Sequence, residues 1–384
     1  MREDSPIRIL LLSDFSREPE RQLLRGVMDY ASEHGGCIFF PLQEFMFDDP
    51  SYSTYVINRA KEVGADAIFG RWGGIDEQAV RRLGIPVILR TSRKNYPNLP
   101  MLSGDYRKIG LMAAEYFRKQ HYVSYAYFGR KGLIWSEQRA EGFRSALEGI
   151  GVQYSELWIE RIGDDWDKVV SWLEGLPKPV ALFAENDLMA RPICEICSDR
   201  GIAVPQEVAV LGVDDDEFTC NITYPSLSSI HMDFRRQGQE LGQAIFRMVA
   251  EGRTYPVRIP IHPTVITERG STLRHNIADP VVSRVLDYID ANYLSYIDVE
   301  DIVKQIPLTR RAIEMRFRAA MEPDTIHSYL TSCRINHLCM LLRTTSRPVS
   351  VLAQESGFKD SLNIGRTFRQ YMGMSPNEYR AIYQ

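Results

Sequence analysis

The sequence predicts an α/β fold with parallel sheets over its first two-thirds, followed by an all-α region that contains two helix-turn-helix units. From residue 7 to about residue 267, short apolar runs alternate with longer amphipathic segments, which is typical of parallel sheets covered by helices on both faces. Beyond residues 275–280, which read HNIADP, only helical periodicity remains. We therefore expect an α/β domain at residues 1–274, a linker at 275–280 and a helical domain at 281–384.

The α/β domain is expected to begin with a strand and a helix that ends at a glycine. Strands are predicted at residues 7–14, 65–70, 85–90, 125–129, 179–187 and 208–215, and helices at residues 19–35, 76–84, 109–120, 139–151 and 235–252. Several strands run directly into polar residues, namely Asp14, Asn186, Asp187 and Asp214–Asp216. Because ligands of parallel α/β sheets bind beyond the carboxyl ends of the strands, these residues indicate a binding site.

The first helix-turn-helix unit is predicted between residues 299 and 318. Asp298 is a good N-cap for a short helix, residues 306–308 (Ile-Pro-Leu) form a tight turn, and Thr309 caps a second helix. That second helix carries Arg310, Arg311, Glu314, Arg316 and Arg318. Its exposed N-terminal half is suited to enter a DNA major groove, where Arg reads guanine edges.

A second unit of the same build begins about fifty residues later, after a long amphipathic helix at residues 327–345. Gly357 suits the left-handed position that ends a short helix, and Asp360 caps the next helix. Ser375 and Glu378 form a capping box for a last helix. A helical bundle with merely solvated arginines is the alternative, but two similar units in tandem favour DNA binding.

Composition and charge describe an ordinary globular protein, with 44% hydrophobic residues, 25% charged residues and a net charge of −4. Residues 281–384 hold 13 Lys and Arg against 11 Asp and Glu, so the helical region is slightly basic although the whole chain is acidic. No apolar run approaches the roughly 20 residues of a membrane helix. The N-terminus is too charged for a signal peptide. We expect a cytoplasmic protein without a membrane partner.

The sequence gives little evidence for a cofactor site or a catalytic site. Cys194 and Cys197 have a metal-like spacing, but no second pair lies nearby, and we expect them, like Cys333 and Cys339, to be buried core thiols. The acidic run at residues 214–217, at the end of a strand, favours a ligand contact and helix caps over a metal. A phosphate loop, a dinucleotide glycine pattern and an H-E-x-x-H motif are all missing from the sequence. We expect no cofactor and no metal, and a sugar-modifying enzyme remains a remote alternative.

Residues 281–384 resemble the DNA-binding domain of the AraC/XylS family of transcription activators. The resemblance is carried by Leu330, Arg334, Ile335, Leu341, Leu342, Leu352, Ala353, Ser356–Phe358, Phe368, Arg369, Gly373, Ser375, Pro376 and Glu378–Arg380. It implies that Arg310, Arg311, Glu314 and Met315 in the first unit, and Ser361, Leu362, Asn363 and Arg366 in the second, face DNA. The segment LNI at residues 362–364 and the helical Gly365 depart from the family pattern, which leaves the operator sequence open.

Residues 7–270 resemble the effector domain of LacI/GalR repressors, which is similar to two-lobed periplasmic sugar-binding proteins. The segments that carry the resemblance are RQLLRGVMDYASEHG, GDYRKIGLMAAEYF, RAEGF, AENDLMA, VAVLGVDDDEFT and PSLSSIHMDFRRQGQELG. The resemblance implies a two-lobed sensor, with two doubly wound lobes, that binds a monosaccharide between them. D-xylose is the favoured effector.

The resemblance also implies which residues bind the sugar. Asp105, Arg139, Asn186 and Asp214 match positions that hold sugar hydroxyls, Trp166 matches an aromatic along a sugar face, Trp135 is expected to line the same cleft, and Arg17 and Arg21 are weaker candidates. Three alternatives stay open: Asp105 as a helix cap, Arg139 as a surface ion pair and Trp166 as a core residue.

The whole chain is thus interpreted as a sugar-controlled transcription regulator. The expected partners are double-stranded DNA with operator half-sites, a second copy of the chain in a homodimer, and RNA polymerase. Activation is favoured over repression. A different sugar or a non-sugar ligand is the alternative effector.

Overall fold

The computed structural model describes residues 5–13, 16–42, 51–72, 75, 77–90, 93–120, 122–161, 163, 166–273, 279–321, 324–359 and 364–383. The chain divides into two compact units, Met1–Arg274 and His275–Gln384. Asp14, most of the linker expected at 275–280, Asp360 and the predicted DNA contacts Ser361, Leu362 and Asn363 lie outside the described residues. Within the described part of the chain, no helix is both long enough and apolar enough to cross a membrane.

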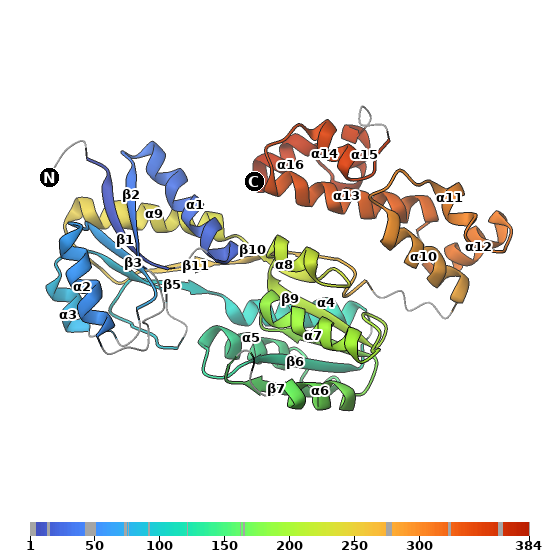
Figure 1. Ribbon diagram of the computed structural model, residues 1–384, viewed down its shortest axis with the longest axis horizontal. Coiled ribbons are helices and arrows are strands. Elements are labelled where there is room, and N and C mark those ends of the chain that lie inside the picture. Colours follow the sequence, from blue (N-terminus) through green and yellow to red (C-terminus); the bar gives the residue numbers. More distant parts are fainter. Residues whose placement is uncertain are drawn as a thin grey trace. The chain divides into compact units, whose positions relative to one another are not determined.

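The first unit has two lobes, each built on a six-stranded sheet (Figure 1). The first lobe has the strand order β11-β5-β4-β3-β1-β2, and all its pairs are parallel. Its strands are β1 (Ile7–Leu12), β2 (Cys37–Leu42), β3 (Ala67–Gly70), β4 (Val87–Leu89), β5 (Met101–Gly104) and β11 (Arg258–Ile261). Its helices are α1 (Glu18–Glu33), α2 (Tyr52–Glu62), α3 (Glu77–Arg82) and α9 (Phe234–Glu251). Separate apolar cores line the two faces of the sheet, one under α1 and α9 and one under α2 and α3.

The second lobe has the strand order β12-β10-β9-β8-β6-β7. Its strands are β6 (Ser124–Arg130), β7 (Gln153–Ile159), β8 (Val180–Ala184), β9 (Val208–Asp214), β10 (Ser228–Met232) and β12 (Pro263–Thr267). Its helices are α4 (Tyr106–Lys119), α5 (Ile134–Ser145), α6 (Trp166–Gly175), α7 (Asp187–Asp199) and α8 (Glu217–Ile222). The predicted parallel α/β architecture is confirmed, with one correction: β12 at the sheet edge pairs antiparallel with β10.

The chain crosses between the lobes three times. It passes from β5 into α4, returns from β10 into α9, and passes again from β11 to β12 through the single residue His262. Each lobe is therefore assembled from segments far apart in the sequence, and three short connections join the lobes. Such connections suit a hinge, because a few residues at element ends can absorb a domain rotation.

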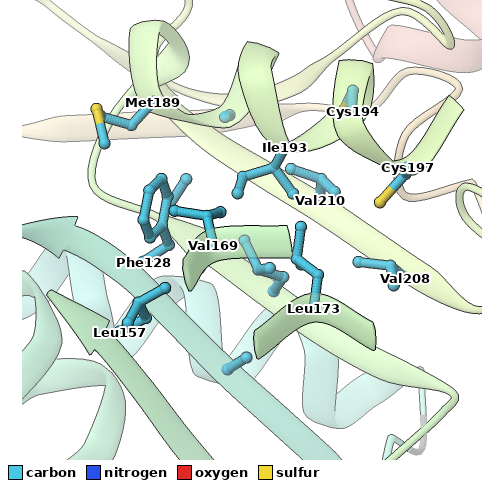
Figure 2. Packing of buried hydrophobic residues seen from close by; sticks show 14 of the residues in the cluster. Phe128, Leu157, Val169, Leu173, Met189, Ile193, Cys194, Cys197, Val208 and Val210 are labelled. Atoms are coloured by element: carbon cyan, nitrogen blue, oxygen red, sulfur yellow. The ribbon is translucent and has the colours of Figure 1, made fainter. Parts of the chain in front are cut away.

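The cysteines of the second lobe belong to its hydrophobic core. Cys194 and Cys197 point from α7 into the cluster that Figure 2 shows around Val169, Leu173 and Val210. Burial raises the pKa of both thiols, which makes them unreactive. Cys339 is also buried, whereas Cys333 is only partly so, which corrects the expectation for that residue. Within the described residues, no group of three or more His, Cys, Asp and Glu side chains could hold a metal ion.

The second unit contains only helices among its described residues, and one long helix joins two small cores. Its helices are α10 (Pro280–Asn292), α11 (Val299–Val303), α12 (Arg310–Met321), α13 (Ile326–Thr344), α14 (Val349–Glu355), α15 (Ile364–Met372) and α16 (Pro376–Tyr383). The N-terminal half of α13 packs into the core formed with α10, α11 and α12. Its C-terminal half packs into the core formed with α14, α15 and α16.

Capping residues set the helix boundaries of this unit as predicted. Asp298 forms a capping box with Asp301, and the Ala312 amide donates to the Thr309 hydroxyl. The Ser375 amide donates to Glu378, whose own amide donates to the Ser375 hydroxyl. Each of these bonds satisfies an amide that the first helical turn leaves without a partner.

Gly357 and Arg334 hold the two helix-turn-helix units together. Gly357 has the predicted left-handed conformation, with φ of 85°, and a Cβ there would lie 2.3 Å from the Tyr293 carbonyl oxygen. The Arg334 guanidinium, on α13, donates to the carbonyls of Tyr293, Ser295 and Ile297, each at 2.8 Å. These bonds satisfy carbonyls that follow α10 and hold this end of the first helix-turn-helix unit against the long helix α13.

Candidate ligand cleft and candidate nucleic-acid interface

A cleft in the first unit encloses about 710 Å³ of empty space, part of it open to solvent. Its lining comes from both lobes and from the connections between them: Arg17, Arg71, Arg90, Leu102, Tyr106, Trp135, Arg139, Asn186, Asp214, Met232, Phe234, Gln237 and Ile261. Tyr106, Phe234 and Ile261 stand at the three crossings between the lobes. The combination of aromatic walls and a few polar groups is typical of a small-molecule site.

Two of the predicted ligand residues lie at strand ends in the second lobe, side by side in the sheet. Asn186 follows β8 and caps α7, where its Oδ1 accepts a hydrogen bond from the Met189 amide at 3.1 Å. Asp214 ends β9 with φ of 107°, and Asp215 follows with φ of 54°. Two consecutive non-glycine residues in this region are strained, and such strain is common where a side chain is aimed into a functional site.

Arg139, from α5, is the most deeply buried cation of the cleft, with 4% of its surface exposed. Its guanidinium donates to the Glu185 carbonyl and lies 3.9 Å from an oxygen of Asp214. Its Cζ also lies 5.0 Å from the ring centre of Trp135 and 5.7 Å from that of Tyr106. No described group accepts from its buried Nε. An unpartnered buried donor is costly, so this atom is available to a ligand.

Asp214 keeps an unusually high pKa despite the cations around it. The pKa of its carboxyl is raised from 3.8 to about 6: burial raises it most, Arg139 lowers it, Glu20 raises it, and Arg90 and Arg17 lower it. Desolvation of the charged form therefore exceeds the attraction of the guanidinium groups. The carboxylate can accept hydrogen bonds from ligand hydroxyls, and at mildly acidic pH it takes up a proton.

Three arginines from the first lobe also line the cleft. Arg71 follows β3, Arg90 follows β4, and Arg17 precedes α1. Arg90 pairs with Glu20 at 2.6 Å, and Arg71 reaches the same Glu20 oxygen at 3.4 Å. Arg71 and Arg90 were not predicted as site residues from the sequence, although Arg71 follows one predicted strand and Arg90 ends another, because only carboxylates and amides were sought at strand ends.

Three other predicted residues lie outside the lining of this cleft. Asp105 is exposed and caps α4, accepting from the Lys108 amide at 3.3 Å. Trp166 begins α6 and packs against the core of the second lobe. Arg21 pairs with Glu18 at 2.8 Å on α1. For Asp105 and Trp166 the structure matches the alternatives of a cap and a core residue.

The first helix-turn-helix unit presents a continuous exposed face on α12. Arg311, Met315 and Arg318 follow one another at helical spacing, all three are exposed, and 67% of the Met315 surface is accessible. Neither arginine has a hydrogen-bond or ion-pair partner among the described residues. Arg310 pairs instead with Glu314 at 2.8 Å and with Glu300 at 3.1 Å, and Arg316 pairs with Asp279 at 2.5 Å. Arg311 and Met315 are thus freer to meet DNA than Arg310 and Glu314.

The second helix-turn-helix unit has a shorter exposed face on α15, similar to the face on α12. Ile364, Phe368 and Met372 face the core, and Arg366 is exposed on the outer side. Gly365 precedes it, and a Cβ added to Gly365 would meet no described atom within 4 Å, so nothing in the packing requires a glycine there. Arg369 lies 3.9 Å from Glu378 and is directed toward α16.

Comparison with known families assigns both units. Residues 114–272 match a periplasmic binding protein-like domain, and residues 302–382 match a helix-turn-helix domain. The xylose operon regulatory protein of Haemophilus influenzae is 25% identical over 97% of this chain and 98% of its own length. The melibiose operon regulatory protein of Escherichia coli is 32% identical over 33% of this chain and 41% of its own length.

A solved structure of a xylose-binding transcription activator has the same fold. It superposes with a TM-score of 0.63 at 22% identity and covers 98% of each chain. The resemblances to AraC/XylS activators and to LacI/GalR effector domains are therefore confirmed. The chain joins a periplasmic binding protein-like domain to a helix-turn-helix domain, and over nearly its whole length it resembles the regulatory proteins of xylose operons.

Proposed function

We propose that this chain is a DNA-binding transcription regulator that responds to a monosaccharide held in the cleft between the lobes of its first unit. The observation that carries the proposal is the convergence of Arg139, Asn186 and Asp214 on one cleft whose walls include Tyr106 and Trp135. Carboxylate, amide and guanidinium groups make directional hydrogen bonds to a polyol, and aromatic rings cover its C–H faces. D-xylose is the first ligand to test, because the full-length relative is a xylose operon regulator.

The second unit supplies the proposed contact with DNA. Arg311 and Met315 on α12 would read bases in one major-groove segment, and Arg366 on α15 would act in the next. Because α13 contributes to both cores, the two reading helices keep a fixed spacing. We place Ser361, Leu362 and Asn363 in the same role, from the family resemblance alone.

We further propose that the regulator acts as a homodimer on tandem half-sites, activates transcription by a contact with RNA polymerase, and works in the cytoplasm. The ligand would favour the closed arrangement of the lobes, to the extent that it binds that arrangement more tightly than the open one. A bond across the lobes supports a partly closed state: the Glu18 amide donates to Asp216 at 3.3 Å. We expect regulation and no turnover, so sugar recovered after incubation should be chemically unchanged.

Calorimetric titration with D-xylose, L-arabinose, D-ribose and D-glucose tests the ligand proposal. Binding of one of these sugars should weaken strongly in Asp214→Ala, which removes a cleft carboxylate. Asp105→Ala is the matched control, because Asp105 is exposed and caps α4 outside the cleft. Equal losses in both variants would move the site toward Asp105, and unchanged binding in Asp214→Ala would refute the proposed site. DNA binding with and without the bound sugar then tests whether the two units communicate.

A further inference from the structure

The three connections between the lobes are tied together by one side chain of the first lobe, Gln237. It lies in the first turn of α9, directly after the crossing from β10. Its Nε2 donates to the Ser103 carbonyl on β5 at 3.1 Å and to the Ile259 carbonyl on β11 at 2.9 Å. β5 leads into the crossing to α4, and β11 leads into the crossing to β12. Two hydrogen bonds therefore join the start of one connection to the strands that lead into the other two.

The same two bonds fix which end of the Gln237 amide is available to a ligand. Both partners are carbonyl oxygens, and only the NH₂ group of a glutamine can donate to them, so the orientation of the amide follows from its neighbours. Both amide hydrogens are thereby used. Gln237 also lines the cleft, although only 4% of its surface is exposed. Oε1 is therefore the polar atom that this side chain can offer to a ligand.

The backbone that carries Gln237 is held firmly within the first lobe. The next residue, Gly238, packs so closely against α1 that a Cβ there would lie 2.0 Å from the Leu23 carbonyl oxygen. Gly26 on α1 makes the reciprocal contact, since its Cβ would lie 1.9 Å from the Arg235 carbonyl oxygen. Interiors packed this closely transmit a displacement instead of absorbing it. We therefore expect a restraint on the Gln237 side chain to act on β5 and β11, and not to be absorbed by a shift of α9.

An acceptor on the first-lobe wall suits a polyol ligand. Each sugar hydroxyl carries one proton to donate as well as lone pairs that accept. The three arginines that line the cleft from the first lobe can only donate. Gln237 adds an acceptor on this lobe, as Asp214 does on the second. A hydroxyl proton that faces the first lobe can therefore be satisfied by Oε1, and a buried polar atom is costly when it is left without a partner.

We infer that Gln237 both contacts the ligand and positions the hinge: its Oε1 accepts a hydrogen bond from a ligand hydroxyl while its Nε2 holds β5 and β11 through Ser103 and Ile259. This inference rests on the proposal that the cleft binds a monosaccharide, and it names the residue through which the ligand acts on the connections. A hydrogen bond to Oε1 polarises the amide and strengthens the two bonds that Nε2 donates. Ligand binding thus restrains the segments that must move when the lobes rotate.

The test pairs one substitution with the removal of single hydroxyls from the sugar. D-xylose and its 2-deoxy, 3-deoxy and 4-deoxy analogues are titrated by calorimetry into the full-length wild type and into Gln237→Met, which keeps the length of the side chain and loses the amide. The variant should bind D-xylose about tenfold more weakly, which is what one hydrogen bond contributes. One analogue should bind the wild type about tenfold more weakly than D-xylose does, yet bind the variant as tightly as D-xylose, because the missing hydroxyl and the missing Oε1 are partners.

A matched control and a second measurement complete the design. Gln239→Met is the control, because Gln239 lies two residues further along α9, is exposed and is not part of the cleft lining. It should leave the affinity for every sugar unchanged. Hydrogen exchange of the wild type, measured by mass spectrometry on peptides that span residues 101–106 and 257–263, tests the hinge without any substitution. Saturating D-xylose should slow exchange in both peptides, and the slowing should be smaller in Gln237→Met.

Each contrary outcome overturns the inference in a distinguishable way. If Gln237→Met weakens all four sugars by the same factor, or none of them, Gln237 does not contact the ligand and the sugar-responsive regulator stands. If D-xylose binds but exchange in both peptides stays unchanged, the ligand does not act on the connections through Gln237. If none of the sugars binds the wild type, the proposed function fails together with the inference.

Discussion

Replacing Asp214 with Asn should change how the stability of the first unit depends on pH. The carboxyl of Asp214 has a pKa of about 6 in the folded protein, against an ordinary value of 3.8. Because the folded state holds this proton more tightly than the unfolded state, protonation stabilises the fold. The stabilisation is complete below about pH 4, is lost as the pH rises toward 6, and changes little above that.

The expected size follows from the two pKa values. A gap of about two pH units corresponds to about 3 kcal/mol in the free energy of unfolding. This is an upper value, because 21% of the Asp214 side chain is exposed and solvent screens part of the penalty. Burial raises the pKa of Asp187 well above its usual range, and the charge of Asp214 raises it further. The contribution of burial is common to both proteins, whereas the substitution removes the effect of the Asp214 charge, so Asp187 cancels only in part.

The assay is urea denaturation of the full-length protein at several pH values between 4 and 7, followed by tryptophan fluorescence. All five tryptophans lie in the first unit, so the signal reports on that unit alone. The free energy of unfolding of the wild type, minus that of Asp214→Asn, should fall by up to about 3 kcal/mol across this range. If the two curves run parallel from pH 4 to pH 7, the carboxylate is not desolvated and the reasoning about this site is wrong.

Three further outcomes follow from the geometry. If ligand hydroxyls donate to the Asp214 carboxylate, ligand binding lowers the pKa of that carboxyl and releases a proton near pH 6. Calorimetry in buffers of different ionisation enthalpy should detect this release, and a binding enthalpy that does not depend on the buffer would contradict the contact. Gly357→Ala should lower the melting temperature of the second unit, measured by circular dichroism, more than Gly373→Ala does. Both glycines have a left-handed φ, but only at Gly357 would a Cβ strike a backbone carbonyl. Equal shifts in the two variants would refute the steric account. Arg311→Ala should weaken operator binding by about 1–3 kcal/mol and relax specificity at one base pair. Arg316→Ala should do neither, because Arg316 forms an ion pair with Asp279, the cap of α10. A uniform loss of binding on all DNA sequences would assign Arg311 to a phosphate contact.

The sequence predicted the interior of each sheet better than its edges. The strands β1, β3, β4, β6, β8 and β9 were all predicted, and their residues are mostly fully buried. The four edge strands β2, β7, β11 and β12 were missed, and their burial is mixed. The interior strands β5 and β10, of four and five residues, were missed as well. An edge strand has one neighbour and partial cover, so its sequence lacks the continuous apolar run that marks a buried parallel strand.

The cleft residues at the strand ends of the second lobe could be predicted from the sequence, whereas the cleft residues at the crossings between the lobes could not. Asn186 and Asp214 lie at the carboxyl ends of predicted strands, so the strand-end rule found them. Tyr106, Phe234 and Ile261 line the cleft because the chain crosses between the lobes at those residues. The crossings depend on which strand joins which sheet, and no local pattern records that.

The arginines of the first lobe show a third limit of sequence reasoning. The strand-end rule would have found Arg71 and Arg90 if cations had been included, but it could not have shown that both pair with Glu20. Glu20, which holds both, is 51 residues before one and 70 before the other. Whether a cation is neutralised by its own protein or available to a ligand is thus decided by tertiary pairing.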